Sequence, residues 1–303
     1  MKVKSLILIL VSTGLLIWLG NKVGIEKIYS NILQANLAWL LCAIVIIPII
    51  IIIRIVRWHY LVGIVVRDLV FLDSAKSFLV GSLLAIITPA KVGDLARDFY
   101  FTHKRTELAT LIVFEKITDL FLYLALSIFM AFKLRVEFGF TLFLISLILL
   151  LLIMKPSLIS RFISVSLPLF LQRKLFVAKS LSSIKIIKNI SVPLLLISII
   201  IALLTVLQFY IIINAFSTVG LSVIFMVFPL TVLMASLPVS FGGIGVREGT
   251  AIYLLSMFNV PKEASVNASL CFYLLNILPF LCGIMFFPRV WDSLKKLYVN
   301  KKT

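Results

Sequence analysis

The residues of this sequence that could do chemistry stand out because they interrupt apolar sequence. The clearest interruption runs from Leu237 to Thr250, which reads LPVSFGGIGVREGT. Backbone that leaves the helical conformation at membrane depth has to be buried in protein or line a wet cavity. The expected helix breakers are Pro238, Gly242, Gly243 and Gly245, and the charged pair that follows is Arg247 and Glu248.

The chemistry that this stretch favours is recognition of an anion. If a helix restarts near Gly245 or Val246, its free N–H groups and positive dipole end face the break, with Arg247 adjacent. That arrangement is a seat for a phosphate, and Glu248 also favours a helix N-terminus electrostatically. The alternative stays open, in which the glycines permit tight helix packing and the Arg-Glu pair neutralises itself.

A second stretch repeats this plan in the first half of the sequence. Thr88 to Arg97 reads TPAKVGDLAR and contains Pro89, Gly93 and the arginine Arg97. Paired segments that Gly and Pro interrupt, one in each half of a chain, point to the substrate site of a transporter. The two stretches therefore predict one site built from both halves.

Two acids lie inside the apolar run that follows. Glu115 and Asp119, in the motif FEKITDL, are four residues apart and share one face of a helix. Ionisable groups inside a span are costly and normally face the interior of a bundle or a water-filled cavity. A purely structural buried pair is the alternative. We expect one cavity for a charged headgroup to be lined by Arg97, Glu115, Asp119, Arg247 and Glu248.

Two further arginines, Arg54 and Arg57, lie at the end of the apolar run from Leu37 to Val56, beside Trp58 and His59. They are candidates for a headgroup contact. The alternative is membrane anchoring, in which the arginines snorkel and the tryptophan lies at the interface.

The composition places these residues in a membrane protein. Of 303 residues, 62% are hydrophobic and only 14% are charged, and several apolar runs are long enough to span a bilayer. The net charge of +17 does not indicate nucleic acid, because the Lys and Arg residues lie in loops between apolar runs. The three cysteines and two histidines lack the spacing of a metal site or catalytic triad, and the sequence contains no P-loop or Rossmann motif. We therefore expect no cofactor and no metal, and an enzymatic role is not favoured.

We predict an all-α polytopic membrane protein with about six full transmembrane helices and two re-entrant or broken-helix hairpins. One membrane domain covers residues 1–303, with inverted pseudo-repeat halves of about 1–154 and 192–288. One hairpin is Ser77–Pro89 with its polar return, and the other is Leu221–Leu237 with the run to Val260. The predicted crossings are Ser5–Gly20, Leu37–Val56, Leu108–Phe132, Phe138–Met154, Val192–Ala215 and Ala264–Phe287.

The loop from Lys155 to Ser191 sets the expected orientation. It holds seven Lys or Arg residues and no acid, which is typical of a cytoplasmic loop. With six crossings, this loop and both termini lie on the cytoplasmic side of the cell membrane. The first hairpin then enters from the cytoplasm and the second from the opposite face.

Four ordered motifs carry a family resemblance over nearly the whole chain: RIVRW at 54–58, ITPAKVGDLAR at 87–97, FEKITDL at 114–120 and LPVSFGGIGVREG at 237–249. Together they resemble the lysylphosphatidylglycerol synthase transmembrane-region family, also described as flippase-like integral membrane proteins. Ala90 stands where the family pattern has a glycine. In the larger bifunctional relatives, this domain translocates aminoacylated phosphatidylglycerol made by a C-terminal soluble transferase domain, which this sequence lacks. Other relatives are linked to polyprenyl-phosphate sugar or hopanoid lipid pathways.

The resemblance implies an α-helical membrane domain that moves or presents a lipid between leaflets. We predict a lipid translocator for an anionic or aminoacylated phospholipid or a polyprenyl-phosphate-linked lipid, whose phosphate the arginines would hold. The alternatives are a membrane-embedded transferase that uses the same charged residues, and an accessory subunit in aminoacyl-phospholipid or lipid-linked glycan synthesis. Besides the membrane lipid, a separate lipid-modifying enzyme and a second copy of the chain are candidate partners, and nucleic acid is not.

Overall fold

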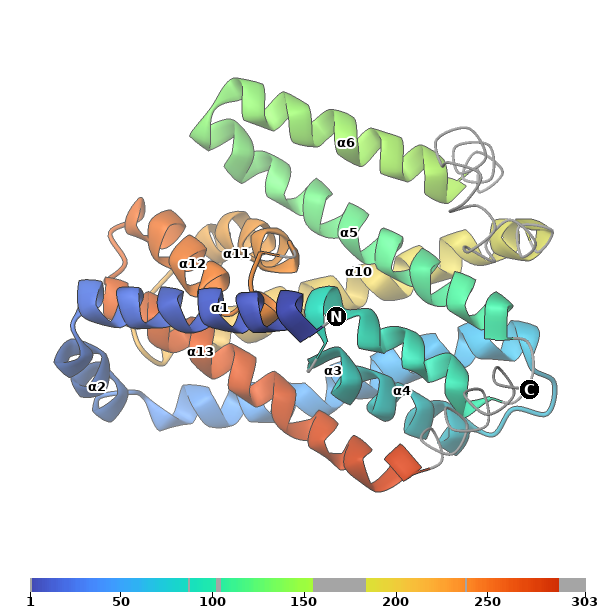
Figure 1. Ribbon diagram of the computed structural model, residues 1–303. Helices are drawn as coiled ribbons and strands as arrows, with labels where there is room; N and C mark the ends of the chain where they lie inside the picture. Colours follow the sequence, from blue (N-terminus) through green and yellow to red (C-terminus); the bar gives the residue numbers. More distant parts are fainter. Residues whose placement is uncertain (1, 87, 102–104, 155–183, 238, 289–303) are drawn as a thin grey trace.

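The computed structural model describes residues 2–86, 88–101, 105–154, 184–237 and 239–288. Every regular element in this part of the chain is a helix, and the long helices run side by side (Figure 1). In chain order they are α1 (Lys2–Val23), α2 (Ile25–Leu33), α3 (Leu37–Val65), α4 (Phe71–Ile86), η1 (Pro89–Tyr100), α5 (Arg105–Leu134), α6 (Val136–Met154), α10 (Ile184–Asn214), α11 (Leu221–Ser236), η3 (Phe241–Gly243), α12 (Val246–Ser256), α13 (Lys262–Ile277) and η4 (Leu278–Phe286), where η marks a 3₁₀ helix.

Four helical stretches are long and apolar enough to cross a membrane, and they correspond to four of the predicted crossings. The protein is therefore an all-α integral membrane protein. The other two predicted crossings fall on α1 and α6, whose apolar parts among the described residues, Leu10–Val23 and Gly139–Leu151, are shorter. The total of six stays a prediction. The four stretches are Leu37–Val65, Glu107–Leu134, Val192–Asn214 and Lys262–Phe286.

α3 is longer than the predicted span that ends at Val56. The Asn36 side chain caps its start by accepting a hydrogen bond from the Ala38 N–H at 3.0 Å. The helix then continues through Arg57 and Trp58, which are 2% and 0% exposed. The predicted end is wrong, because the helix continues past Val56 and the polar groups at this point are buried against protein.

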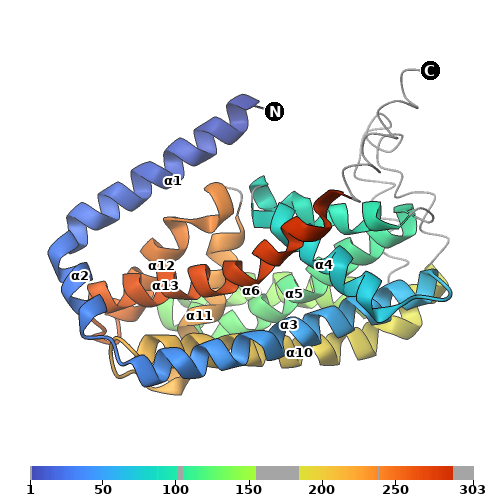
Figure 2. The same ribbon diagram turned by 90° about the horizontal axis from the view of Figure 1, so that it is seen from below.

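α3 and α10 pack against each other and run in opposite directions. The backbone N–H of Asn36, just before α3, donates to the carbonyl of Ala215, just after α10, at 2.8 Å. The start of α3 and the end of α10 therefore lie at one end of the molecule, which we call the Asn36 end. The last turn of α3 lies at the other end, which we call the Val65 end (Figure 2).

The first broken segment consists of α4 and η1, which fold back on each other. At the turn, the Thr88 hydroxyl accepts a hydrogen bond from the Gly93 N–H at 2.7 Å. Gly93 lies so close to α4 that a Cβ there would stand 2.2 Å from the carbonyl of Leu84. The predicted helix start at Ser77 is wrong, since α4 begins at Phe71 with an acid in its first turn, where the helix dipole favours negative charge.

The second broken segment consists of α11, η3 and α12. Its backbone turns through left-handed conformations at Gly242, Gly243 and Gly245, with φ angles of 64°, 80° and 82°. Residues with a Cβ rarely adopt such angles. A Cβ on Gly243 would also stand 2.5 Å from the carbonyl oxygen of Ala235 in α11, so glycine is needed for this turn. Pro238, which was expected to help break the helix, lies outside the described residues.

The two hairpins open at opposite ends of the molecule. α4 follows α3 through a short loop at the Val65 end, whereas α11 follows α10 at the Asn36 end. The turns of both hairpins point inward, and η1 contacts η3 (Figure 2). The two breaks in the helical structure therefore meet between the ends.

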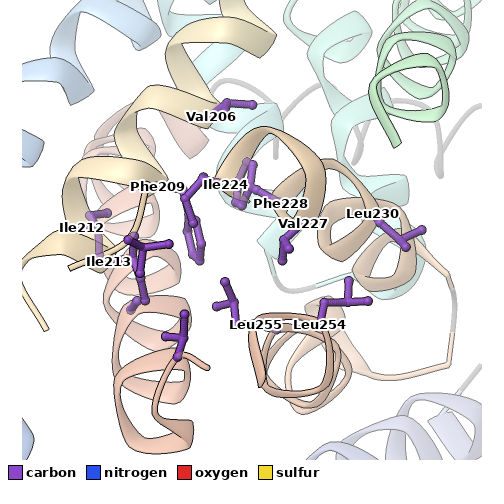
Figure 3. Packing of buried hydrophobic residues seen from close by; sticks show 14 of the residues in the cluster. Val206, Phe209, Ile212, Ile213, Ile224, Val227, Phe228, Leu230, Leu254 and Leu255 are labelled. Carbon is purple, nitrogen blue, oxygen red and sulfur yellow. The ribbon is translucent and has the colours of Figure 1, made fainter. Parts of the chain in front are cut away.

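Apolar packing fixes the second hairpin to α10 and α13 (Figure 3). Phe209 of α10 stacks on Phe228 of α11 with ring centroids 4.5 Å apart, and Phe272 of α13 packs edge-on against both rings. Leu254 and Leu255 add α12 to the same cluster. Because lipid tails are as apolar as these side chains, burial away from lipid does not by itself favour this arrangement. Van der Waals contacts in the close packing therefore hold the hairpin in place.

Candidate functional site

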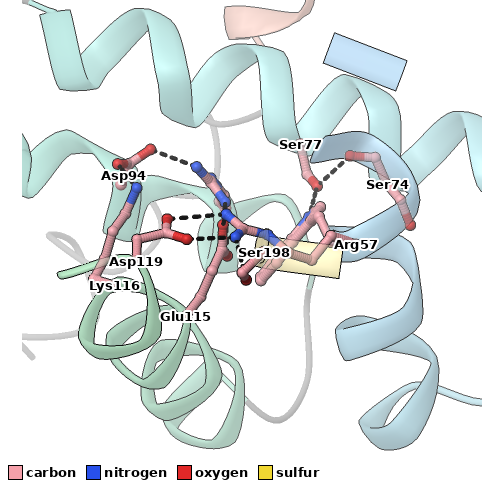
Figure 4. Close-up of polar contacts among 10 residues, drawn as sticks. Arg57, Ser74, Ser77, Asp94, Glu115, Lys116, Asp119 and Ser198 are labelled. Atoms are coloured by element: carbon pink, nitrogen blue, oxygen red, sulfur yellow. Dashed lines mark hydrogen bonds and ion pairs between the residues drawn. The ribbon is translucent and has the colours of Figure 1, made fainter. Parts of the chain in front are cut away.

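The main cluster of charged side chains, which we call the charge network, joins α3, α5, α10 and η1 (Figure 4). Arg57 of α3 donates from Nη2 to Glu115 at 2.5 Å and from Nη1 to Asp119 at 2.5 Å. The same Nη1 donates to the hydroxyl of Ser198 on α10 at 2.8 Å. Because Glu115 and Asp119 are four residues apart on α5, one guanidinium reaches both acids.

A second arginine, Arg97 of η1, shares Glu115 with the first. Its Nη1 donates to Glu115 at 3.2 Å, and its Nη2 donates to Asp94 at 2.6 Å. Lys116 of α5 pairs with the other oxygen of Asp94 at 2.6 Å. Burial alone would raise the pKa of the Asp94 carboxyl, but the charges of Arg97 and Lys116 outweigh this effect and hold that pKa well below its usual range.

Aromatic and hydroxyl side chains hold the second arginine in place. The Arg97 guanidinium lies over the ring of Phe78 at 4.5 Å and over that of Trp58 at 5.4 Å. Trp58 donates from Nε1 to the Ser77 hydroxyl at 2.7 Å, and Ser77 donates to the carbonyl of Ser74 at 2.9 Å (Figure 4). These contacts order the buried guanidinium in one position.

One side of the charge network is open. Glu115 is fully buried and Arg97 nearly so, whereas the side chains of Asp119 and Lys116 are 28% and 43% exposed. A ligand that approaches the network would meet these two groups of α5 first.

Arg54 adds a positive charge near this open side. It lies one helical turn before Arg57, is half-buried, and has Asp119 among its electrostatic neighbours. Within the described residues it forms no ion pair. Arg54 adds one positive charge to the ion-paired groups, which balance among themselves: Arg57, Arg97 and Lys116 against Asp94, Glu115 and Asp119.

A second set of polar side chains, which we call the break group, lies at the break before α12 and consists of Arg247, Glu248, Ser240 and Tyr273. Arg247 is only 7% exposed, and its Nη2 donates to the carbonyl of Gly242 at 3.4 Å, which is long for a hydrogen bond. Its guanidinium lies 4.7 Å from the ring centre of Tyr273. In the part of the chain that the structure covers, Arg247 Nη1 and Ser240 Oγ are buried without a hydrogen-bond partner.

Glu248 caps the start of α12 and does not pair with Arg247. One carboxylate oxygen accepts from the Gly245 N–H at 2.6 Å, and the other accepts from the Ser269 hydroxyl at 3.2 Å. This return of an N3 carboxylate to the N-cap N–H satisfies a free donor of the helix terminus. Arg247 is consequently left without a carboxylate among the described residues.

A protein-family model described as "Lysylphosphatidylglycerol synthase TM region" matches residues 5–283, which include both broken segments and both charged groups. The chain belongs to this family. The resemblance seen in the four sequence motifs is thereby confirmed. No curated protein and no solved structure gives a significant match. Membership links this integral membrane protein to the synthesis or transport of lipids or aminoacyl phospholipids.

The site residues predicted for this family member form two groups and not one. The charge network contains Arg97, Glu115 and Asp119, and the break group contains Arg247 and Glu248. Among the described residues, no hydrogen bond or ion pair of Arg247 or Glu248 reaches the network. Contact between the two regions is made by the segments η1 and η3.

Sequence reasoning missed several members of the charge network. Asp94 is three residues before Arg97, a spacing that could have suggested the pair. Lys116 lies in the FEKITDL motif but was given no partner. Ser198 is 141 residues from Arg57, and nothing in its local sequence indicates the contact.

Proposed function

We propose that this protein translocates a lipid between the leaflets of its membrane and binds the phosphate of that lipid at the break group. The lipid is an anionic or aminoacylated phospholipid or a polyprenyl-phosphate-linked lipid. The observation that carries the proposal is the state of Arg247, whose guanidinium is buried without a carboxylate among the described residues.

A buried charge without a partner is strongly destabilising, so an arginine in this state favours an anionic ligand. The planar fork of Arg247 suits two oxygens of one phosphate. Ser240 adds a buried hydroxyl that has no hydrogen-bond partner among the residues that the structure describes. The Tyr273 hydroxyl also lies at the break, since a Cβ on Gly242 would stand 2.9 Å from its oxygen. A phosphate can accept hydrogen bonds from all of these groups: the guanidinium, the two hydroxyls and the N–H groups at the start of α12.

The position of the break group supports movement between leaflets. The two hairpins reach inward from opposite ends, and their breaks are in contact. In transporters, discontinuous helices of this kind form a site near the membrane midplane that is reached alternately from either side. Arg54, near the open side of the charge network, adds attraction for an anionic headgroup.

The proposal includes the full topology expected from the sequence. The protein lies in the plasma or inner membrane of the cell and crosses it six times. Both termini and the loop 155–191 are then cytoplasmic. Most of this loop lies outside the described residues. The halves 1–154 and 192–288 are then inverted repeats, and the Val65 end is cytoplasmic.

Cysteine labelling tests this orientation. Arg67→Cys lies at the Val65 end and Thr218→Cys at the Asn36 end, and both residues are exposed. With the three native cysteines replaced by serine, an impermeant maleimide added to intact cells should label Thr218→Cys and spare Arg67→Cys. The reverse pattern would contradict the orientation, and equal labelling would contradict a bundle that spans the membrane.

Leaflet exchange tests the function. Purified protein in proteoliposomes should accelerate exchange of a fluorescent anionic phospholipid, measured by chemical quenching of the outer leaflet without ATP. Arg247→Ala should lower the rate about tenfold or more, the loss expected for a charge-assisted hydrogen bond. Arg247→Lys keeps the charge but loses the planar fork of the guanidinium. Its exchange rate should therefore lie between those of the unchanged protein and Arg247→Ala.

The matched control is Arg135→Ala, which removes an exposed arginine in the turn between α5 and α6. It should exchange lipid like the unchanged protein. A folded Arg247→Ala protein with unchanged exchange would remove Arg247 from the site. If the purified protein instead converts a donor and an acceptor lipid into a new product, it is a transferase. A need for a separate enzyme or a second copy of the chain would show as activity only in the reconstituted complex.

A further inference from the structure

A groove between α1 and α12 lies apart from both charged groups. Its volume is about 270 Å³, and its walls include Trp18 and Lys22 of α1, Gly249 and Tyr253 of α12, and Lys262 at the start of α13. α1 contacts α12 and runs along the outside of the bundle (Figure 2). The groove is therefore open to the surrounding lipid.

The groove is narrow at one end and wide at the other. At the start of α12, the helices touch, because a Cβ on Gly245 would stand 2.5 Å from the Cβ of Leu15. One turn further on, a Cβ on Gly249 would meet nothing within 4 Å. The two helices thus separate as they run toward the Asn36 end, and the wide end of the groove lies there.

One wall of the groove is formed by α12, whose length can be compared with the thickness of one leaflet. α12 has 11 residues, which at 1.5 Å per residue give about 16 Å. The hydrocarbon core of a bilayer is about 30 Å thick, so α12 is about as long as the acyl region of one leaflet. It begins at the inner break and ends at the Asn36 end, the course that a lipid tail of that leaflet follows.

Two lysines stand at the wide end. Lys22 and Lys262 both line the groove and are exposed, and neither forms an ion pair within the described residues. The ammonium of Lys22 lies 4.6 Å from the ring centre of Trp18, an aromatic residue that suits the membrane interface. The groove therefore combines an apolar body with a positive mouth.

We propose that this groove binds an anionic phospholipid, with an acyl chain between α1 and α12 and the phosphate between Lys22 and Lys262. The proposal does not rest on lipid transport. Gly249 and Tyr253 are four residues apart and share a face of α12, whereas Arg247, two residues before Gly249, lies on a different face. The groove is thus a second lipid site, separate from the break group.

Quenching of Trp18 fluorescence tests the proposal. The protein is reconstituted in phosphatidylcholine vesicles that contain about one tenth phosphatidylglycerol, and bromine is placed on the acyl chains of one lipid or the other. Subtracting the signal of Trp18→Phe isolates this tryptophan. Brominated phosphatidylglycerol should quench Trp18 more strongly than brominated phosphatidylcholine at the same mole fraction.

Changes to the groove should remove this preference. Lys22→Gln and Lys262→Gln should each lower the relative association of phosphatidylglycerol about fivefold, whereas Lys27→Gln, on α2 at the same end and outside the groove, should leave it unchanged. Gly249→Leu fills the open space and should reduce quenching by both lipids. Equal quenching by the two lipids in the unchanged protein would overturn the proposal. So would a preference for phosphatidylglycerol that survives both in a variant with Lys22→Gln and Lys262→Gln together and in Gly249→Leu.

Discussion

Buried arginines have opposite surroundings in the charge network and in the break group. In the network, Arg57 and Arg97 each pair with two carboxylates, and they share Glu115. In the break group, the contacts of Arg247 with described residues are a long hydrogen bond to a backbone carbonyl and an aromatic neighbour. All three guanidinium groups are more than nine-tenths buried, so solvent does not account for the difference.

The difference is most informative because an acid stands next to Arg247. Glu248 uses both oxygens on the Gly245 N–H and the Ser269 hydroxyl, which fixes the start of α12. A buried cation that is held away from the neighbouring acid retains its capacity for an anion. We infer that the network holds α3, α5 and η1 together and that the break group binds the ligand.

The largest effect should follow from breaking the network at its shared acid. Glu115→Gln removes the charge that Arg57 and Arg97 share and leaves two buried cations undercompensated. We expect a loss of about 3–5 kcal/mol in the free energy of unfolding, seen as a lower Tm and a lower folded yield in size-exclusion chromatography.

Asp119→Asn is the matched control for that change. Asp119 is partly exposed, and Arg57 keeps Glu115 when it is lost. Its effect should be about 1 kcal/mol or less. Equal losses for the two variants would show that the shared acid has no special part in the network.

A smaller effect should follow from forcing the first hairpin apart. A methyl group on Gly93 would overlap the backbone of α4 at Leu84, and overpacking of this kind costs about 1–3 kcal/mol. Gly93→Ala should therefore lower Tm. Gly249→Ala, also in a hairpin but with open space around it, should leave Tm unchanged or raise it, since alanine favours a helix by about 1 kcal/mol. A stable Gly93→Ala protein would contradict the close approach of η1 to α4.

The smallest effect should be at Arg54, which lies beside the network and has no ion pair in the described part of the chain. Arg54→Gln should leave Tm unchanged and lower the exchange of an anionic lipid by about fivefold at low salt. The difference between Arg54→Gln and the unchanged protein should shrink at high salt, because Arg54 is partly exposed and dissolved ions screen its charge. Exchange of a zwitterionic lipid is the internal control, and an equal loss for both lipids would show that Arg54 acts on the fold.

The sequence predicts the membrane class and the places where helices break, because both depend on local features. Long apolar runs give the spans, and the glycines at Gly242, Gly243 and Gly245 adopt conformations that side chains disfavour. The i,i+4 spacing of Glu115 and Asp119 likewise predicts that they share a face.

The partners across helices could not be predicted, because spacing on one helix does not say which helix lies opposite. The sequence predicts Arg97, Arg247 and Glu115 in one cavity without saying which of them pair, and the structure pairs Glu115 with Arg97 and with Arg57 of α3. The end of α3 was misplaced for the same reason. A hydropathy pattern treats Arg57 as the exit of a span, whereas its charge is compensated inside the protein by Glu115 and Asp119.

The most direct test measures stability and function together in one variant from each region. Arg247→Met replaces a buried cation, which has no ion pair among the described residues, by an apolar side chain of similar length. It is compared with Glu115→Gln for Tm and for leaflet exchange per folded protein. We predict that Arg247→Met keeps or raises Tm while exchange falls about tenfold or more, whereas Glu115→Gln lowers Tm. An Arg247→Met protein that unfolds like Glu115→Gln, or that exchanges lipid at the original rate, would contradict the division between a structural network and a binding site.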